Sequence, residues 1–185
     1  MIKNKAIFLD RDGTLIKSLI KENTKNFKLR PPYNYNELKV FGDLSFLNLY
    51  SKKYLLIIVS NQPDLYTKVQ SLKFHNFINL QIKKKIYIKD FFFCICLKSD
   101  PNCNCYKPKT FMIKKALLKH NISINHSYFI GDTWRDVKLA NNVNLKSILI
   151  DRGFYNHLKD EFIEYNAKFD FKIKSFYQLK DIIKF

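Results

Sequence analysis

The sequence predicts an α/β fold in which helices cover both faces of a central parallel sheet. Five apolar runs have the length of buried strands, and amphipathic stretches with helical spacing separate them. Alternation of strand and helix implies right-handed crossovers and therefore a three-layer sandwich. The expected strands are residues 5–10, 54–60, 91–97, 127–131 and 146–151.

The helices of this sandwich are predicted from the spacing of apolar residues. One amphipathic face is formed by Phe74, Phe77, Ile78 and Ile82. A second follows a possible cap at Thr110 and is formed by Met112, Ile113, Ala116 and Leu117. We expect a last helix over residues 175–184.

Length and composition favour one folded domain over residues 1–185. Hydrophobic residues make up 46% of the chain and aromatic residues 16%, which argues against disorder. No apolar run approaches the roughly 18 residues of a membrane span, and the N-terminus leads directly into a strand. We therefore expect a cytoplasmic monomer with no membrane partner.

The net charge of +17 raises the question of nucleic-acid binding. The excess consists of 29 lysines against 4 arginines and is spread along the chain without a dominant block. A compositional origin in an AT-rich coding sequence is favoured over a nucleic-acid surface, which stays open as the alternative. Either origin would steer a phosphorylated substrate towards the protein.

The first expected strand ends in Asp10-Arg11-Asp12-Gly13-Thr14, which places two carboxylates at the sheet edge where α/β proteins bind ligands. On extended backbone, residues at i and i+2 point the same way, so both carboxylates are expected to reach one substrate. We predict that Asp10 is a nucleophile towards phosphorus and that Asp12 is the general acid and later the general base. By itself such a string also fits a solvated turn or part of a calcium loop.

A polar segment at about residues 17–40 follows this motif and interrupts the strand and helix pattern. Its position suggests a short flap that folds over the site and excludes water, and an ordinary surface insertion is the alternative.

Other strand ends carry groups that phosphoryl transfer requires. Ser60, Asn61 and Gln62 offer a hydroxyl and amides to phosphoryl oxygens, and Lys107, followed by proline, offers a positive charge. Asp132 is expected to bind Mg²⁺ together with Asp10 and the carbonyl of Asp12. We expect Asp136 to stabilise the groups that bind the metal without binding the metal itself, with helix capping or a pair with Arg135 as the alternatives.

All four cysteines fall within residues 94–105, as Cys94, Cys96, Cys103 and Cys105. Two C-x-C pairs around a short loop can supply four thiolates to one tetrahedral Zn²⁺ with no open position. We therefore expect a structural zinc loop just before Lys107, in preference to disulfides or ordinary buried cysteines.

In their order, these motifs resemble those of the haloacid dehalogenase (HAD) superfamily of phosphatases. The quoted residues are Asp10-x-Asp12-Gly13-Thr14, Ser60-Asn61-Gln62, Lys107-Pro108 and Gly131-Asp132-x-x-x-Asp136. With the cysteine loop, the pattern is similar to subfamily IIIA, which contains D-glycero-D-manno-heptose 1,7-bisphosphate 7-phosphatase and histidinol-phosphate phosphatase. The resemblance implies a Rossmann-like core without a large cap domain, an aspartyl-phosphate intermediate, Mg²⁺ and a structural zinc.

The resemblance also assigns residues near the substrate and shows departures from the heptose pattern. Substrate contacts are implied for Asn61, Gln62, Tyr106 and Thr133. Cys96 replaces a zinc-binding histidine, which preserves the site. Tyr106 replaces an arginine that grips the second phosphate of the sugar, so the substrate can differ.

The sequence thus predicts a Mg²⁺-dependent phosphatase of a small phosphorylated sugar, for instance a heptose phosphate. The alternatives are a phosphatase of histidinol phosphate or of a polynucleotide 3′ end, and a non-catalytic, zinc-stabilised binding module.

Overall fold

A computed structural model describes residues 3–22 and 27–184 of the chain. Its centre is a six-stranded sheet in the order β5-β4-β1-β6-β7-β8, in which every pair of neighbouring strands is parallel. The strands are β1 (Ala6–Leu9), β4 (Leu55–Asn61), β5 (Asp90–Cys94), β6 (Tyr128–Gly131), β7 (Lys146–Ile150) and β8 (Phe171–Ile173). The predicted α/β class and parallel sheet are confirmed.

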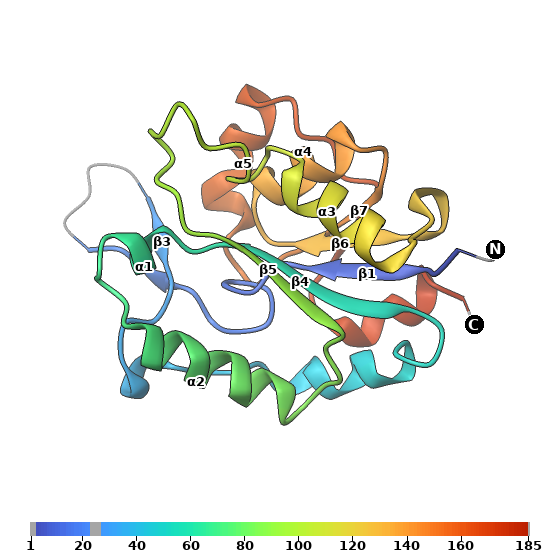
Figure 1. The fold of residues 1–185 in the computed structure, drawn as a ribbon, viewed down its shortest axis with the longest axis horizontal. Coiled ribbons are helices and arrows are strands. Elements are labelled where there is room, and N and C mark those ends of the chain that lie inside the picture. The colour runs from blue at the N-terminus through green and yellow to red at the C-terminus, as the bar shows by residue number, and fades with distance from the viewer. Residues whose placement is uncertain (1–2, 23–26, 185) are drawn as a thin grey trace.

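Helices cover both faces of this sheet (Figure 1). One layer contains α2 (Leu72–Lys83) with the 3-10 helices η2 (Gly42–Leu49) and η4 (Phe176–Asp181). The opposite layer contains α3 (Phe111–His120), α4 (Trp134–Asn142) and α5 (Tyr155–Glu164). The remaining short helices are η1 (Tyr35–Glu37), α1 (Pro63–Tyr66) and η3 (Ile124–His126).

The alternation of side chains along β1 shows why the strand must lie in the centre. Ile7 and Leu9 pack with α2 and η2, whereas Ala6 and Phe8 pack with α3 and α4, and all four are fully buried. A strand buried on both faces has no solvent face, so its sequence is continuously apolar.

Several expected boundaries differ from the structure. The sequence-based prediction lacked β8, and the predicted C-terminal helix over residues 175–184 is a short 3-10 helix instead. Thr110 does precede α3, but its side chain makes no capping hydrogen bond because its backbone is already helical. The third strand ends at Cys94, where the cysteine loop begins.

The segment after β1 forms a small flap. Within it, β2 (Leu19–Ile20) pairs antiparallel with β3 (Leu29–Arg30), while residues 23–26 of the predicted flap lie outside the described residues. Phe27 stacks on His157 of α5, with ring centroids 4.5 Å apart. This aromatic contact anchors the flap to α5. No large cap is present among the described residues.

An ion pair ties the C-terminal part of the chain to the loop after β1. Arg152 donates to both carboxylate oxygens of Asp43, at 2.9 and 3.0 Å, and to the carbonyl of Thr14 at 3.2 Å. The backbone N–H of Phe176 donates to the same aspartate at 2.8 Å.

No helix within the described residues has the length and apolar character needed to cross a membrane.

Candidate active site

Three neighbouring strands bring the candidate residues to one edge of the sheet. Because β4, β1 and β6 are adjacent and parallel, their carboxyl ends meet at this edge. Asp10 follows β1, Ser60 is the last residue but one of β4, and Asp132 follows β6. All three side chains are buried.

Asp10 is held by two donors. Its Oδ1 accepts a hydrogen bond from Ser60 Oγ at 2.8 Å and another from Lys107 Nζ at 2.7 Å. Residues that are 50 and 97 positions away in the chain thus converge on one carboxylate oxygen.

Lys107 joins Asp10 to a second carboxylate. Its Nζ also donates to Asp136 Oδ1 at 2.6 Å and to the carbonyl of Val59 at 3.1 Å. Asp136 in turn accepts from the backbone N–H and the hydroxyl of Thr133, closing a capping box at the start of α4. Asp136 therefore combines helix capping with a contact to Lys107, and its predicted alternative partner Arg135 does not bind it.

The electrostatics of this cluster reflect burial and charge. Burial, opposed by the Lys107 ammonium, raises the pKa of Asp10 to about 6, and Asp136 and Asp12 add to the rise. Burial likewise raises the pKa of Asp132 well above its usual value, with contributions from Asp10 and Asp136. Although burial opposes it, the two carboxylates beside Lys107 raise its pKa, so this side chain stays cationic.

Three buried carboxylates against one ammonium create a need for further positive charge. Ligand oxygens of Asp10, Asp132 and Asp136 all lie within 4.8 Å of one another. A hard divalent cation with oxygen ligands fits such a donor set.

Two glycines allow the acidic groups to approach the backbone. A Cβ on Gly13, whose φ is +89°, would lie 2.0 Å from Asp132 Oδ2, and a Cβ on Gly131 would lie 2.3 Å from the Cβ of Asp136. Any side chain at either position would displace an acidic residue of the cluster.

The side chain of Asp12 has different partners from that of Asp10. Its Oδ1 and Oδ2 accept from Arg11 Nε and Nη2, each at 3.1 Å, and Gln62 Nε2 also donates to Oδ2. Although β1 ends at Leu9, Asp10 and Asp12 both line one open cleft, so the two carboxylates can reach the same ligand.

The predicted substrate residues fall into two groups. Asn61, Tyr106 and Thr133 line an open cleft above Asp10. Asn61 also accepts from the backbone N–H of Lys107 at 2.8 Å and so positions the lysine. Gln62 is buried among Arg11, Asp12 and Ser60 and is not part of the cleft lining.

The flap forms one wall of this cleft through Phe27, Lys28, Leu29, Arg30 and Tyr33. The opposite walls include residues that sequence reasoning missed, namely Asp64, Lys98, Arg135 and Glu161. No motif signals them, because isolated charged residues in a charge-rich chain carry no positional information. The burial of Arg11 was missed as well, although its position just after a continuously apolar run is a signal of burial.

The four cysteines come together as predicted. The sulfur atoms of Cys94 and Cys103, of Cys96 and Cys105, and of Cys103 and Cys105 lie 3.6, 3.7 and 3.6 Å apart. These separations exclude disulfides and are close to the roughly 3.8 Å between thiolates of a tetrahedral site with Zn–S bonds of about 2.3 Å.

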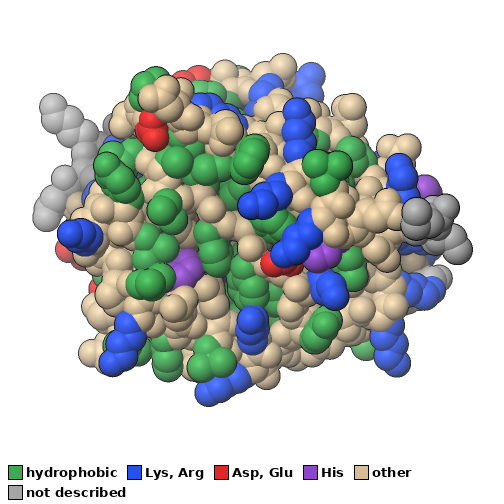
Figure 2. Space-filling model, viewed as in Figure 1, with side chains coloured by type: hydrophobic (Ala, Val, Ile, Leu, Met, Phe, Trp, Pro, Cys, Tyr) green, Lys and Arg blue, Asp and Glu red, His purple; other side chains and the backbone are tan. Residues whose placement is uncertain are grey.

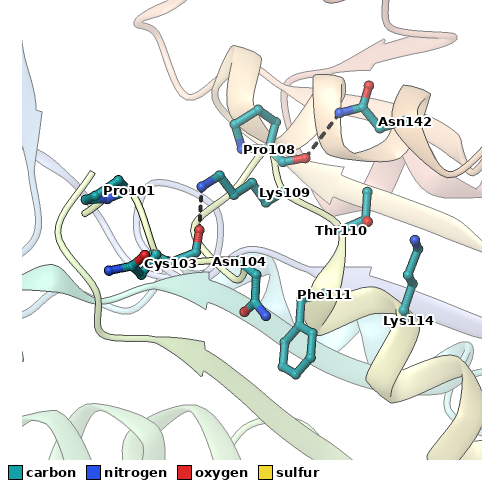
Figure 3. A pocket seen from close by; sticks show the side chains of 10 residues that line it. Pro101, Cys103, Asn104, Pro108, Lys109, Thr110, Phe111, Lys114 and Asn142 are labelled. Carbon is teal, nitrogen blue, oxygen red and sulfur yellow. Dashed lines mark hydrogen bonds between the residues drawn. The ribbon is translucent and has the colours of Figure 1, made fainter. Parts of the chain in front are cut away.

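A second hollow lies on the outer side of the cysteine loop (Figure 3). There Lys109 Nζ donates to the carbonyl of Cys103, and Asn142 Nδ2 donates to the carbonyl of Pro108 at 3.2 Å. Both contacts brace the segment that carries Lys107, and the hollow contains none of the clustered acids.

Basic side chains are scattered over the face of the molecule shown in Figure 2. Lysines and arginines alternate there with hydrophobic and neutral side chains and do not form one block. The basic charge on this face is therefore dispersed.

The fold and the strand-end groups define a class of protein, and a comparison with protein families gives the same class. A HAD-hydrolase-like family model matches residues 104–179. Over these residues the chain is similar to the haloacid dehalogenase-like hydrolases, and the sequence-based resemblance to phosphatases of this superfamily is confirmed.

Curated relatives include two bacterial bifunctional proteins. The histidine biosynthesis bifunctional protein HisB of Buchnera aphidicola subsp. Schizaphis graminum is 34% identical over 160 residues, covering 84% of this chain and 43% of the relative. HisB of Blochmanniella floridana is 34% identical over 164 residues, covering 85% and 44%. The chain thus spans less than half the length of these curated relatives.

Solved structures support the same fold. D,D-heptose 1,7-bisphosphate phosphatase from B. bronchiseptica, complexed with magnesium and phosphate, matches with a TM-score of 0.73 and 16% identity over 97% of this chain and 99% of that one. A haloacid dehalogenase-like family protein from Streptococcus pneumoniae matches with a TM-score of 0.66 and 17% identity over 97% and 98%.

The close approach at Gly131 generates a stability prediction. Gly131→Ala is expected to lower the free energy of unfolding by roughly 1–3 kcal/mol, because α4 must move to admit the methyl group. Urea denaturation measures this loss. Gly42→Ala is the control, since its Cβ meets nothing within 4 Å, and it is expected to change stability by less than about 0.5 kcal/mol. Equal losses in both variants would contradict the packing argument.

Proposed function

We propose that the chain is a Mg²⁺-dependent phosphatase of small phosphomonoesters that works through an aspartyl-phosphate intermediate. The observation that carries this proposal is the buried contact of Asp10 Oδ1 with Ser60 Oγ and Lys107 Nζ, at 2.8 and 2.7 Å. Two donors orient one oxygen of the carboxylate, and we assign the attack on phosphorus to the other oxygen, Oδ2. Ser60 and Lys107 also lie where negative charge increases during transfer.

The reaction proceeds in two steps. In the first, a bond forms between Asp10 Oδ2 and phosphorus, the bond to the leaving oxygen breaks, and Asp12 gives its proton to that oxygen. In the second, water attacks the phosphorus of the aspartyl phosphate, Asp12 takes a proton from the water, and Asp10 is released with inorganic phosphate. Asp12 therefore gives one proton to the leaving alcohol in the first step and takes another from water in the second.

Mg²⁺ would be held by Asp10, Asp132 and the carbonyl of Asp12, and when bound it would neutralise charge on the phosphoryl oxygens. The buried surplus of carboxylates over ammonium groups supports this assignment. Asp136 is proposed to act through Lys107 and the capping of α4.

Replacement of the nucleophile tests the reaction. Asp10→Asn is expected to lower kcat/KM for p-nitrophenyl phosphate and for alkyl phosphates by at least about 10³-fold, because an amide does not attack phosphorus. Asp160→Asn, on the exposed face of α5, is the control and should keep wild-type rates. Undiminished turnover by Asp10→Asn would exclude the mechanism. A wild type that turns over none of these esters would instead favour the non-catalytic binding module.

Histidinol phosphate is the substrate that we place first. The 34% identical relatives are named as histidine biosynthesis proteins, and the cleft contains a carboxylate suited to an amine. Asp64 is half-buried at the start of α1, and burial, with Asp12 adding to the effect, raises its pKa. An ammonium group of a substrate would relieve this unfavourable burial of charge.

A small phosphorylated sugar, which the sequence favoured, is the second candidate. Arg135 lines the same cleft, and its buried Nε has no hydrogen-bond partner among the described residues. A guanidinium at this position can bind a second phosphate in place of the arginine that Tyr106 replaces.

A substrate panel separates these candidates. Wild type is expected to turn over histidinol phosphate with a higher kcat/KM than heptose phosphates, and Asp64→Asn should lower that value roughly tenfold while changing sugar phosphates little. Asp160→Asn again serves as the control. Faster turnover of heptose phosphates, with no selective effect of Asp64→Asn, would favour the sugar.

A polynucleotide 3′ end stays an alternative substrate, and it would show a steep dependence of KM on salt. The single domain over residues 1–185, the monomeric state and the cytoplasmic location also stay predictions.

We further propose that the four cysteines bind a structural Zn²⁺. Their sulfur separations support a tetrahedral set, and the loop that they close leads directly to Lys107. Zinc would fix this loop and thereby the lysine.

Metal analysis tests the zinc proposal. The purified protein is expected to contain about one Zn²⁺ per chain, and Cys105→Ser should reduce this content and lower the melting temperature, because three thiolates hold zinc less tightly. Ser99→Ala, an exposed change in the same loop, should preserve both. A zinc content near zero in the wild type would exclude the site.

A further inference from the structure

Arg11, between the two motif acids, is fully buried, with 0% of its surface exposed. A guanidinium removed from water is strongly destabilising unless its donors are paired. The pairing found here is asymmetric. Nε and Nη2 face Asp12, each 3.1 Å from a different carboxylate oxygen, so the flat guanidinium grips the carboxylate with two parallel hydrogen bonds.

The other side of Arg11 is fixed by helix α2. Its Nη1 lies 2.9 Å from His75 Nδ1 and 3.4 Å from Asn79 Oδ1. Burial and the adjacent Arg11 lower the pKa of His75 to about 4, so this imidazole is neutral at pH 7. Because an arginine always donates, His75 Nδ1 is the acceptor and its proton is on Nε2.

Gln62 closes the arrangement around Asp12. Its Oε1 accepts from Arg11 Nη2, and its Nε2 donates to Asp12 Oδ2 and to Ser60 Oγ, the latter at 3.1 Å. Asp12 nevertheless lines the cleft, and 14% of its side chain is exposed. The hydrogen bonds from Arg11 and Gln62 thus hold the Asp12 carboxylate on its buried side and leave its cleft side open to a substrate.

We propose that Arg11 is a positioning residue for Asp12, braced by His75 and Asn79 and assisted by Gln62. It orients the carboxyl group towards the leaving oxygen and stabilises the carboxylate that forms once the proton has left. This inference rests on the proposed function, because it assigns Asp12 the proton transfer of the first step. Arg11 itself does not touch the substrate.

The dependence of kcat/KM on the leaving group tests this role. kcat/KM covers the steps up to release of the alcohol, so it excludes the hydrolysis of the aspartyl phosphate. An alkyl phosphate needs a proton on its leaving oxygen, whereas p-nitrophenyl phosphate releases a stable phenolate and needs little help. A defect in positioning Asp12 therefore affects the alkyl phosphate selectively.

The experiment compares Arg11→Met and Arg11→Lys with wild type on histidinol phosphate, or on the best alkyl phosphate of the panel, and on p-nitrophenyl phosphate. Arg11→Met is expected to lower kcat/KM for the alkyl phosphate by roughly 10²-fold and that for the aryl phosphate by only a few-fold. Arg11→Lys should recover part of the loss, because it keeps the charge but not the two-pronged contact.

His75→Leu keeps a buried apolar side chain on α2 but removes the acceptor of Arg11 Nη1 and the ring contact with Phe93. It keeps Arg11 itself and so provides a milder test if Arg11→Met does not fold. It should give the same selective loss with a smaller size. Ile82→Val, a buried change on the same helix outside this network, is the control and should keep the wild-type ratio of the two substrates.

Equal losses on both substrates, or no loss on either, would overturn the positioning role. If the wild-type protein has no phosphatase activity, or an activity that Asp10→Asn leaves unchanged, the proposed function is overturned and this inference with it. A wild-type protein that is active through Asp10, with variants at Arg11 and His75 that keep the ratio, would overturn the inference alone.

Discussion

The contact of one buried ammonium with two buried carboxylates is the constraint on which the rest of this site depends. Lys107 reaches Asp10 after β1, the Val59 carbonyl in β4 and Asp136 in α4. The ammonium without the carboxylates, or the carboxylates without the ammonium, would be buried charges without compensation. The lysine therefore fixes the relative positions of two strands and a helix, and the supports behind it, Asn61 and the cysteine loop, fix the lysine.

The two motif acids belong to separate networks, which gives them separate environments. Asp10 faces an ammonium and a hydroxyl, whereas Asp12 faces a guanidinium and an amide. The proposed nucleophile and the proposed proton carrier need different properties, and two identical side chains can acquire such properties from their neighbours. Gln62 links the two networks, because its amide donates to Ser60 on one side and to Asp12 on the other.

The sequence predicted the parts of the molecule that local patterns determine. Strand positions followed from buried apolar runs, and the convergence of Asp10, Ser60 and Asp132 followed from the common edge at which parallel strands end. β8 was not predicted, because three residues at a sheet edge, with Lys172 exposed, carry too weak a pattern. The orientation of Asp12 and the contact of Arg11 with His75, 64 residues away, depend on tertiary packing that no local spacing encodes.

The Arg152–Asp43 ion pair has a consequence for the order in which the site can be completed during synthesis. The arginine holds the carbonyl of Thr14, and the aspartate is in turn held by the backbone of Phe176. A growing chain that has already produced both motif acids still lacks this brace until Arg152 and Phe176 have left the ribosome. The loop that carries the motif acids is made early, but the arginine that supports it follows 138 residues after Thr14.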